Sequence, residues 1–391
     1  MRTMKQLHSP TARKRESSEQ VLRALEERVA LRGTNRTAAK AAPVLIELLE
    51  DSDPPADPQA ILSLLAQIAV GSPDDVACGG ERHPSALLEP PASESHAARR
   101  KMALECERAV ACGAHVYLRW FANESSVARC AAAHLLAFVD PQSGEIDDAL
   151  AVRAKDTDEN VGVRSSALLA LGIRRTAHAE DWPHVQPNAG VEASILEGAI
   201  AFAALGSRDA PLVEGAESDA VEILARGVAT RSPFPEQGRS RSFPWPALER
   251  MLLGSLARGR GRSARAQSAL LRLLAAAAER GRAERIASAL LVLSFGEPTG
   301  AAFSALRPSV EVFRGATSWS AEQRAVLRGI VDHDPLWPQS AESAPSVRHA
   351  DACAIQIALK RMLEVAYYPS RVGVRTALGL VVSAGAGDAK R

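Results

Sequence analysis

The spacing of apolar and polar residues predicts helices along most of the chain. In the stretch VGVRSSALLALG (161–172), apolar residues recur at helical spacing and define one face of an amphipathic helix: Val163, Ala167, Leu168 and Leu171. Similar spacing predicts helices over 37–51, 58–71, 96–123 with a break at Gly113, 217–229, 247–259, 263–281, 282–296, 300–313 and 320–333. The alternations of Val, Ile, Thr and Tyr that indicate strands are nearly absent. The predicted fold class is therefore all-α.

Proline and glycine mark the breaks between these helices. The acidic stretch DSDPPADP (51–58) separates the first two helices, which we expect to pack as an antiparallel pair. Residues 72–95 and 230–246 are predicted to be loops because prolines interrupt them repeatedly. Ser320 and Gln323 have the spacing of a capping box, which predicts where the last well-defined helix begins.

Part of the chain is repetitive. NESSVARCAAAHLLAF (123–138) aligns with DENVGVRSSALLALGI (158–173) at an offset of 35 residues. In this alignment Asn123 matches Asp158, and Arg129 matches Arg164. A third stretch, EASILEGAIAFAALG (192–206), follows after 34 more residues, with glycine at the arginine position. Each copy is expected to contain a helix, a turn and a second helix, so the period predicts stacked helix pairs.

The repeated unit resembles the HEAT repeat, which has an acidic turn and a Val-Arg pair at the start of its second helix. This resemblance implies a right-handed α-solenoid of helix pairs. It also implies a structural ladder in which Asp158 pairs with Arg164, and Asn123 with Arg129. More widely, the chain is similar to uncharacterised HEAT-repeat proteins of high-GC bacteria, a resemblance that carries no assigned chemistry.

The 391 residues exceed one typical compact core and suit an elongated array. Residues 1–20 are polar and charged and are predicted to form a disordered arm. We expect HEAT-like repeats over 21–206. Over 207–391 we expect degenerate helical repeats that end in a helical cap, with one or two helices in 347–382.

Charge is segregated along the chain although its net value is only +1. Residues 41–225 contain 13 basic and 29 acidic side chains, whereas 226–285 contain 13 arginines and four acidic side chains. The candidate anion- or partner-binding residues in this basic segment are Arg239, Arg241, Arg258, Arg260, Arg262 and Arg265. Arginine binds phosphate and carboxylate bidentately, which favours nucleic acid, a phospholipid headgroup or an acidic protein surface as partner. The two alternatives are that the arginines reflect high-GC codon bias, or that this segment pairs with the chain's own acidic half.

No constellation typical of catalysis is present. HExxH, P-loop, Rossmann and GxSxG motifs are missing from the sequence. The DHD triplet (332–334) is interpreted as a polar helix end and HAEDWPH (178–184) as a solvated loop, rather than as metal fragments. Cys78 and His83 lack an oxyanion hole and an orienting acid. We therefore expect no catalytic residue, cofactor or metal.

The remaining features favour a cytoplasmic protein. The sequence begins with a polar, basic stretch without an apolar segment behind it, and no apolar run is long enough to span a membrane. The five cysteines form no CxxC pair and are interpreted as reduced thiols. His115 and His134 lie within predicted helices and are interpreted as structural residues with satisfied hydrogen bonds.

Together these patterns favour a non-catalytic scaffold that binds a partner protein. The alternative is nucleic-acid or other polyanion binding through 226–285. Within that alternative, a fold like the HEAT-like DNA alkylpurine glycosylases ranks lower, because acidic middle repeats would repel DNA. A HEAT-like bilin lyase is a third hypothesis, for which the sequence shows no tetrapyrrole-binding pattern.

Overall fold

The computed structural model describes most of the predicted helical regions. The described residues are 36–51, 55, 57–71, 94–140, 143–176, 191–207, 210–229, 244–245, 248–258, 264–295, 319–337, 346–347, 356, 359, 368–369 and 371–378. Several predictions lie wholly outside these residues, among them the arm at 1–20, the loop at 178–184 and the helix over 300–313. Nearly all described elements are helices, so the all-α fold class is confirmed.

By its internal contacts the chain divides into two units. Unit 1 comprises Met1–Ile223 and Pro233–Ser255, and unit 2 comprises Leu224–Ser232 and Leu256–Arg391. The predicted boundary at 206 therefore differs from this division, which assigns part of the later segment to unit 1. Two contacts explain the difference. Trp245 packs on His134 of unit 1, and Leu248 lies against Gly198 of the same unit.

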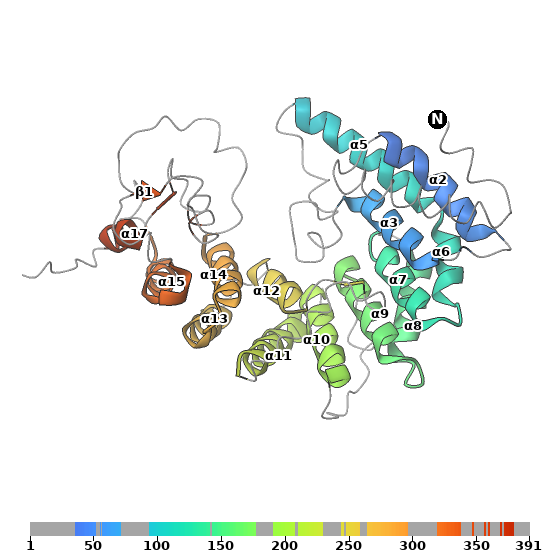
Figure 1. The fold of residues 1–391 in the computed structure, drawn as a ribbon. Helices are drawn as coiled ribbons and strands as arrows, with labels where there is room; N and C mark the ends of the chain where they lie inside the picture. The colour runs from blue at the N-terminus through green and yellow to red at the C-terminus, as the bar shows by residue number, and fades with distance from the viewer. Residues whose placement is uncertain are drawn as a thin grey trace, which may run out of the picture. The chain divides into compact units, whose positions relative to one another are not determined.

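The first described helices of unit 1 pack on one another: α2 (Arg36–Glu50), α3 (Pro58–Val70) and α5 (Glu94–Ala111) (Figure 1). The side chain of Asp57 accepts a hydrogen bond from Ala60 N and caps α3, directly after the acidic stretch predicted to separate this pair. The predicted break at Gly113 is confirmed, because Gly113 separates α5 from α6 (Ala114–Phe121) as the N-cap of the latter.

Two helix pairs follow at the predicted repeat. The first pair is α6 with α7 (Ser126–Leu136), and the second is α8 (Gly144–Lys155) with α9 (Val161–Arg174). The second helices of the two pairs, α7 and α9, also pack against each other. Next comes α10 (Val191–Gly206), which packs on α9, then α11 (Ala210–Ala229) and α12 (Leu248–Arg258).

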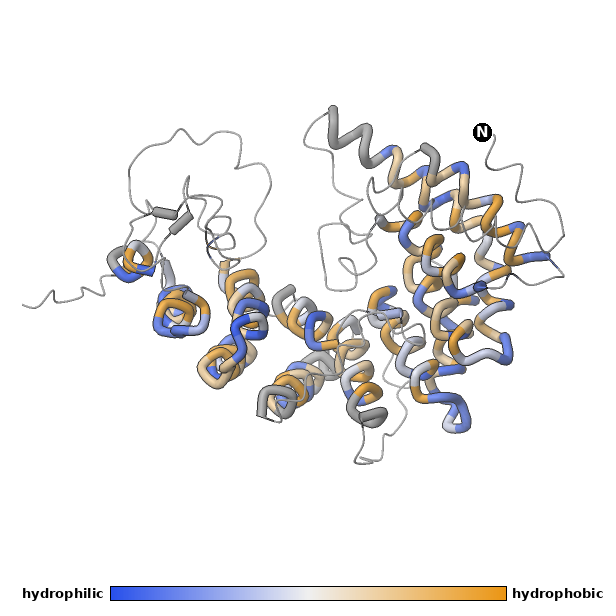
Figure 2. Tube along the Cα trace, in the orientation of Figure 1, coloured by the Kyte–Doolittle hydropathy of each residue, from blue (hydrophilic) through white to orange (hydrophobic). Residues whose placement is uncertain are grey.

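Helix α9 is more deeply buried than an amphipathic helix. Its predicted apolar face is buried, and so is every other residue from Val163 to Arg174, including Ser165 and Ser166. The reason is that α7, α8 and α10 all pack against it. Figure 2 shows the resulting mixture of apolar and polar positions on these helices. The one-sided interpretation of 161–172 was therefore wrong in extent, although the helix itself was predicted correctly.

Unit 2 contains the mutually packed helices α13 (Ala264–Ala276), α14 (Arg280–Phe295) and α15 (Ala321–Asp332). The predicted capping box at the start of α15 is confirmed, with both reciprocal Ser320 and Gln323 bonds formed. A 3₁₀ turn, η6 (Asp334–Leu336), packs on α14, and α17 (Arg371–Ala377) packs on α15. The sequence did not predict the two-residue antiparallel strands β1 (Ser346–Val347) and β2 (Tyr368–Pro369).

Among the described helices, none combines the length and hydrophobicity needed to cross a bilayer.

Candidate functional site

A buried carboxylate joins the two repeated helix pairs. Glu159, in the turn between α8 and α9, has a side chain only 3% exposed. Its Oε1 lies 2.7 Å from Nη2 of Arg129 on α7, and its Oε2 lies 3.1 Å from Nη1 of Arg153 on α8. The backbone N–H of Asn160 also donates to Oε1. Both carboxylate oxygens are thus occupied, as a buried charge requires.

Arg129 also holds the turn that precedes α7, the helix on which it lies. Nη1 of Arg129 donates to the carbonyl oxygens of Asn123 (2.6 Å) and Glu124 (2.8 Å). The side-chain amide oxygen of Asn123 instead accepts from the backbone N–H of Ser125. Asn123 and Arg129 are therefore brought together as the ladder predicts, but through the backbone of Asn123 rather than its side chain.

The predicted partners Asp158 and Arg164 form no hydrogen bond or ion pair with each other in the described part of the chain. Asp158 is exposed, and its backbone N–H bonds to Asp156. Arg164 is buried, and its Nε donates to the carbonyl of Ala154 in the last turn of α8. The acid that links the pairs is the next residue, Glu159. The physical reason is local, because Glu159 precedes the N-cap Asn160 and faces inward, while Asp158 lies outside.

Arg174 donates five hydrogen bonds to described residues of unit 1, and no sequence pattern singled it out. Its side chain is fully buried at the C-terminal end of α9. Its guanidinium donates to the carbonyls of Leu136, Val139, Asp140 and Ser143, and its Nε pairs with Asp147 of α8. This one side chain thereby supplies hydrogen-bond donors to carbonyl groups at the end of α7 and in the loop between α7 and α8. The available signal was an arginine that directly continues the apolar run ALLALGI.

Other helix ends are held in a similar way. Arg119 and Trp120 on α6 both donate to the carbonyl of Leu49 at the end of α2, at 2.9 and 3.1 Å. In unit 2, Nε of Arg371 on α17 donates to the carbonyl of Val331 at the end of α15. Cations near helix C-termini are favourable because the unpaired carbonyls there carry partial negative charge. The described arginines of these clusters thus have a structural explanation.

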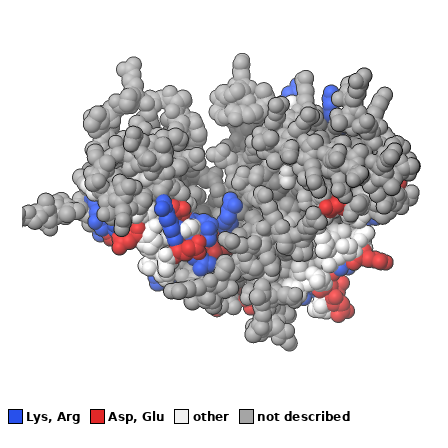
Figure 3. All heavy atoms as spheres, viewed as in Figure 1, with Lys and Arg blue, Asp and Glu red and all other residues white. Residues whose placement is uncertain are grey.

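Of the six candidate anion-binding arginines, only Arg265 has a described side chain. Arg239, Arg241, Arg260 and Arg262 lie outside the described residues, and only the backbone of Arg258 is described, at the end of α12. Arg265 lies on α13 and is exposed. On the face shown in Figure 3, basic and acidic side chains of the described residues are interspersed, with acidic atoms near α8.

The DHD triplet binds arginines. Asp332 pairs with Arg375 of α17 (3.2 Å), and Asp334 pairs with Arg371. His333 ends α15 as its C-cap, consistent with the predicted polar helix end. Among the described residues, no group of three or more His, Cys, Asp or Glu side chains could hold a metal ion. The Cys78 and His83 pair lies outside the described residues.

The two helical histidines differ. His115 pairs with Glu50 at 2.8 Å and is exposed. His134 is buried, and neither of its ring nitrogens has a hydrogen-bond partner. The interpretation of His134 as a satisfied structural residue was therefore wrong.

Comparison with protein-family models gave no match to this chain, and no curated protein matches its sequence. Its function is therefore inferred from the geometry.

Proposed function

We propose that this chain is a non-catalytic, right-handed α-solenoid of HEAT-like helix pairs that binds a partner protein in the cytoplasm. The observation that carries the proposal is the bond between Arg129 and Glu159, which links one helix pair to the next. A stack of helix pairs presents a continuous surface along its length, and such a surface can bind an extended protein partner. The cytoplasmic assignment is supported by the described cysteines Cys112 and Cys130, which are both reduced thiols.

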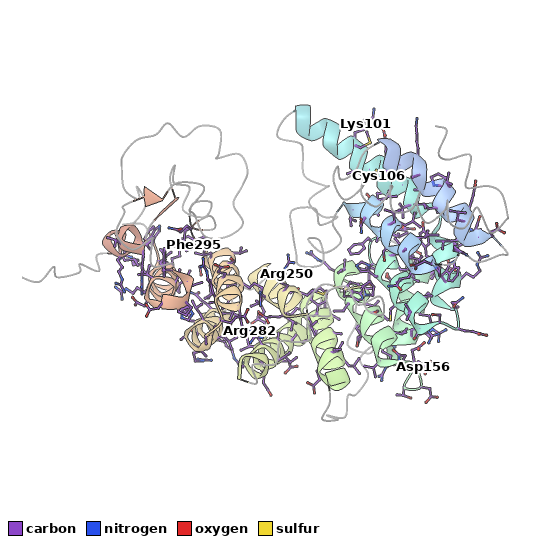
Figure 4. The ribbon with its side chains drawn as sticks, viewed as in Figure 1. Lys101, Cys106, Asp156, Arg250, Arg282 and Phe295 are labelled. Atoms are coloured by element: carbon purple, nitrogen blue, oxygen red, sulfur yellow. The ribbon has the colours of Figure 1, made fainter. Side chains whose placement is uncertain are left out.

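The outer side of α8 is the surface that we propose for the partner. Glu145, Asp148 and Val152 follow one another at helical spacing and are exposed, Val152 to 67%. The neighbouring turn adds the exposed Asp158, and Asp156 lies at the outer edge of that turn (Figure 4). Acidic groups around an apolar side chain favour a basic protein partner with an apolar contact residue.

The experiment is affinity capture with the full chain, followed by a matched surface variant. The variant Glu145→Lys/Asp148→Lys/Val152→Asp changes only exposed side chains of α8 and should leave helicity unchanged. The proposal expects a specific protein to bind the wild type and to lose at least about tenfold in affinity with this variant. The control Arg265→Glu/Arg272→Glu alters α13 and should bind as the wild type does. Equal binding by all three proteins would contradict the proposed surface.

A second candidate function, polyanion binding by unit 2, is supported by one observation. Arg265 and Arg272 on α13 and Arg328 on α15 are exposed, and no described carboxylate pairs with them. If they contact phosphates, binding to a DNA duplex should weaken with salt, with a slope of about 0.9 in log K against log salt for each contact. Replacing all three arginines with glutamine should reduce the magnitude of this slope by the contribution of two to three phosphate contacts. No duplex binding at low salt would remove this candidate.

A further inference from the structure

Two contacts show how α13 and α15 are aligned in unit 2, where they lie side by side (Figure 1). The side-chain amide of Gln267 on α13 donates to the carbonyl oxygen of Glu322 on α15 at 2.9 Å. One turn later on α13, Leu271 lies against Gly329 of α15, where an added Cβ would be 2.6 Å from the leucine side chain. From the first contact to the second, both helices advance toward their C-termini. They are therefore a parallel pair.

This alignment places Arg272 and Arg328 on the same side of the helix pair. Arg272 follows Leu271 and Arg328 precedes Gly329, so each lies one residue from the same contact. One residue along an α-helix is a rotation of about 100°. In two parallel helices that face each other, a step forward on one helix and a step back on the other turn both side chains toward the same side. The two exposed arginines are therefore neighbours at one level of the pair.

The outer face of α13 continues this basic surface. Arg265 lies seven residues before Arg272, which places it on the same face two turns earlier, about 10 Å away along the helix axis. Ser268 lies between them and is exposed as well. One cation thus lies at some distance from Arg272, whereas Arg328 lies directly beside it.

The described carboxylates around the arginine pair are engaged elsewhere or lie further along the chain. Glu322 bonds to the hydroxyl group that caps α15, and Asp332 bonds to an arginine of α17. Glu279 lies in the turn after α13, seven residues beyond Arg272. Neither Arg272 nor Arg328 forms an ion pair with a described residue. Two neighbouring cations repel each other, so an anion held between them is favoured twice.

The chemistry of the side chains selects the kind of anion. A guanidinium group is planar and presents parallel N–H donors that match two oxygens of a phosphate group. A tetrahedral phosphate has enough oxygens to accept such pairs from two arginines at once. A chloride ion has no such set of acceptors.

We propose that Arg272 and Arg328 form a two-arginine clamp that binds a single phosphate group, and that Arg265 contacts a different phosphate of the same polyanion. The proposal deepens the second candidate function and rests on it, since a polyanion supplies the two phosphates.

The first test uses inorganic phosphate and the full-length chain with ¹⁵N-labelled arginine. Single glutamine variants assign the Nε–Hε resonances, and chloride at equal ionic strength is the reference. The resonances of Arg272 and Arg328 should shift together, with one apparent dissociation constant. Arg272→Gln and Arg328→Gln should each weaken phosphate binding at least about fivefold, and Arg328→Lys should weaken it too, because lysine keeps the charge but not the planar fork. Arg265→Gln is the control and should bind phosphate as the wild type does.

The second test counts phosphate contacts on a DNA duplex from the salt dependence of binding. If Arg272 and Arg328 share one phosphate, replacing both with glutamine should reduce the magnitude of the slope by about 0.9, the contribution of one contact. Independent contacts would give a reduction of about 1.8. Arg265→Gln should reduce the magnitude by a further 0.9, or about one contact. All substituted side chains are exposed, and circular dichroism verifies that helicity is unchanged.

Several results would overturn the clamp. They are a lack of response to phosphate, separate dissociation constants for Arg272 and Arg328, and an equal loss of phosphate binding in Arg265→Gln. A reduction of the slope by two contacts in the double variant would also overturn it, while leaving polyanion binding in place. Conversely, phosphate binding that depends on both arginines without any binding of the duplex would support the clamp and remove the second candidate function.

Discussion

The carboxylate of Glu159 binds the guanidinium of Arg129 at 2.7 Å, across a separation of thirty residues. Both side chains are largely withdrawn from water, at 3% and 14% exposure. Because Arg129 also binds the turn before α7, this single contact joins the turns of two successive helix pairs. The contact thus links the α6–α7 pair to the α8–α9 pair.

Removing the charge of Glu159 should destabilise unit 1 strongly. Glu159→Gln leaves Arg129 without its carboxylate, and breaking a buried pair on one side costs about 3 kcal/mol. The neighbouring exposed residue provides the control, because Asp158→Asn should change the free energy of unfolding by less than about 0.5 kcal/mol. Urea unfolding followed by circular dichroism measures both. Equal effects of the two variants would show that Glu159 does not have this role.

Arg174 should be more sensitive to substitution than the arginine beside it. Arg174→Met keeps the aliphatic length but leaves four carbonyls and Asp147 without their donor, and a single unpaired buried group costs about 1–3 kcal/mol. We expect at least about 3 kcal/mol of destabilisation from this variant and a smaller loss from Arg174→Lys, which keeps the charge. Arg175→Lys is the control, and thermal unfolding compares the three. A loss in Arg175→Lys as large as that in Arg174→Met would contradict this assignment.

These two residues also show how far the sequence predicts the site. The period identified an acidic turn followed by an arginine, but Asp158 and Glu159 are adjacent acids, and only the turn geometry decides which one faces inward. Arg174 is even less visible, because the residue 35 positions earlier is Val139, so the alignment gives no matching arginine. A repeat pattern reports shared apolar spacing well and individual polar contacts poorly.

The fold was more predictable where the signals are local. The break at Gly113 and the capping box at Ser320 depend on a few neighbouring residues, and both are confirmed. The position of Trp245 against His134 depends on the path of the chain between them, which neither spacing nor composition encodes. The β1–β2 pair could not be predicted either, because its two-residue strands are too short to show an alternation of apolar and polar residues.

Glycines at the contact of α9 with α10 should resist replacement. A Cβ at Gly206 would collide with the carbonyl oxygen of Gly172, and a Cβ at Gly172 would lie 2.8 Å from Cα of Ala203. Gly206→Ala should therefore force the helices apart and cost about 1–3 kcal/mol, as overpacking does. Gly215→Ala on α11 meets no atom within 4 Å and should stabilise by up to about 1 kcal/mol. Thermal unfolding should give shifts of opposite sign, and equal signs would contradict the close packing.

The attachment of α17 to α15 should weaken at acid pH. The Arg371 guanidinium holds the pKa of Asp334 below its usual range. Because this pKa is lowered in the folded protein, the pairing of Asp334 with Arg371 stabilises the attachment of α17 above about pH 4. This contribution is lost as the pH falls through the lowered pKa. At pH 7, Asp334→Asn should therefore increase amide hydrogen exchange in α17. Glu322→Gln, at the start of α15, is the control. As the pH falls through the lowered pKa of Asp334, the difference in exchange between the wild type and Asp334→Asn should shrink, and a difference that grows on acidification would contradict this dependence.

The described cysteines should differ in reactivity by their depth. Burial raises the pKa of the Cys130 thiol to about 11, so almost none of it is thiolate at pH 8, whereas Cys112 is exposed. Iodoacetamide should modify Cys112 at least about a hundredfold faster than Cys130 in the native protein, because only the thiolate reacts. Peptide mass spectrometry measures each site separately, and unfolding in urea should bring the two rates together. Equal rates in the native protein would show that Cys130, which lies on α7 one turn before His134, is accessible without unfolding.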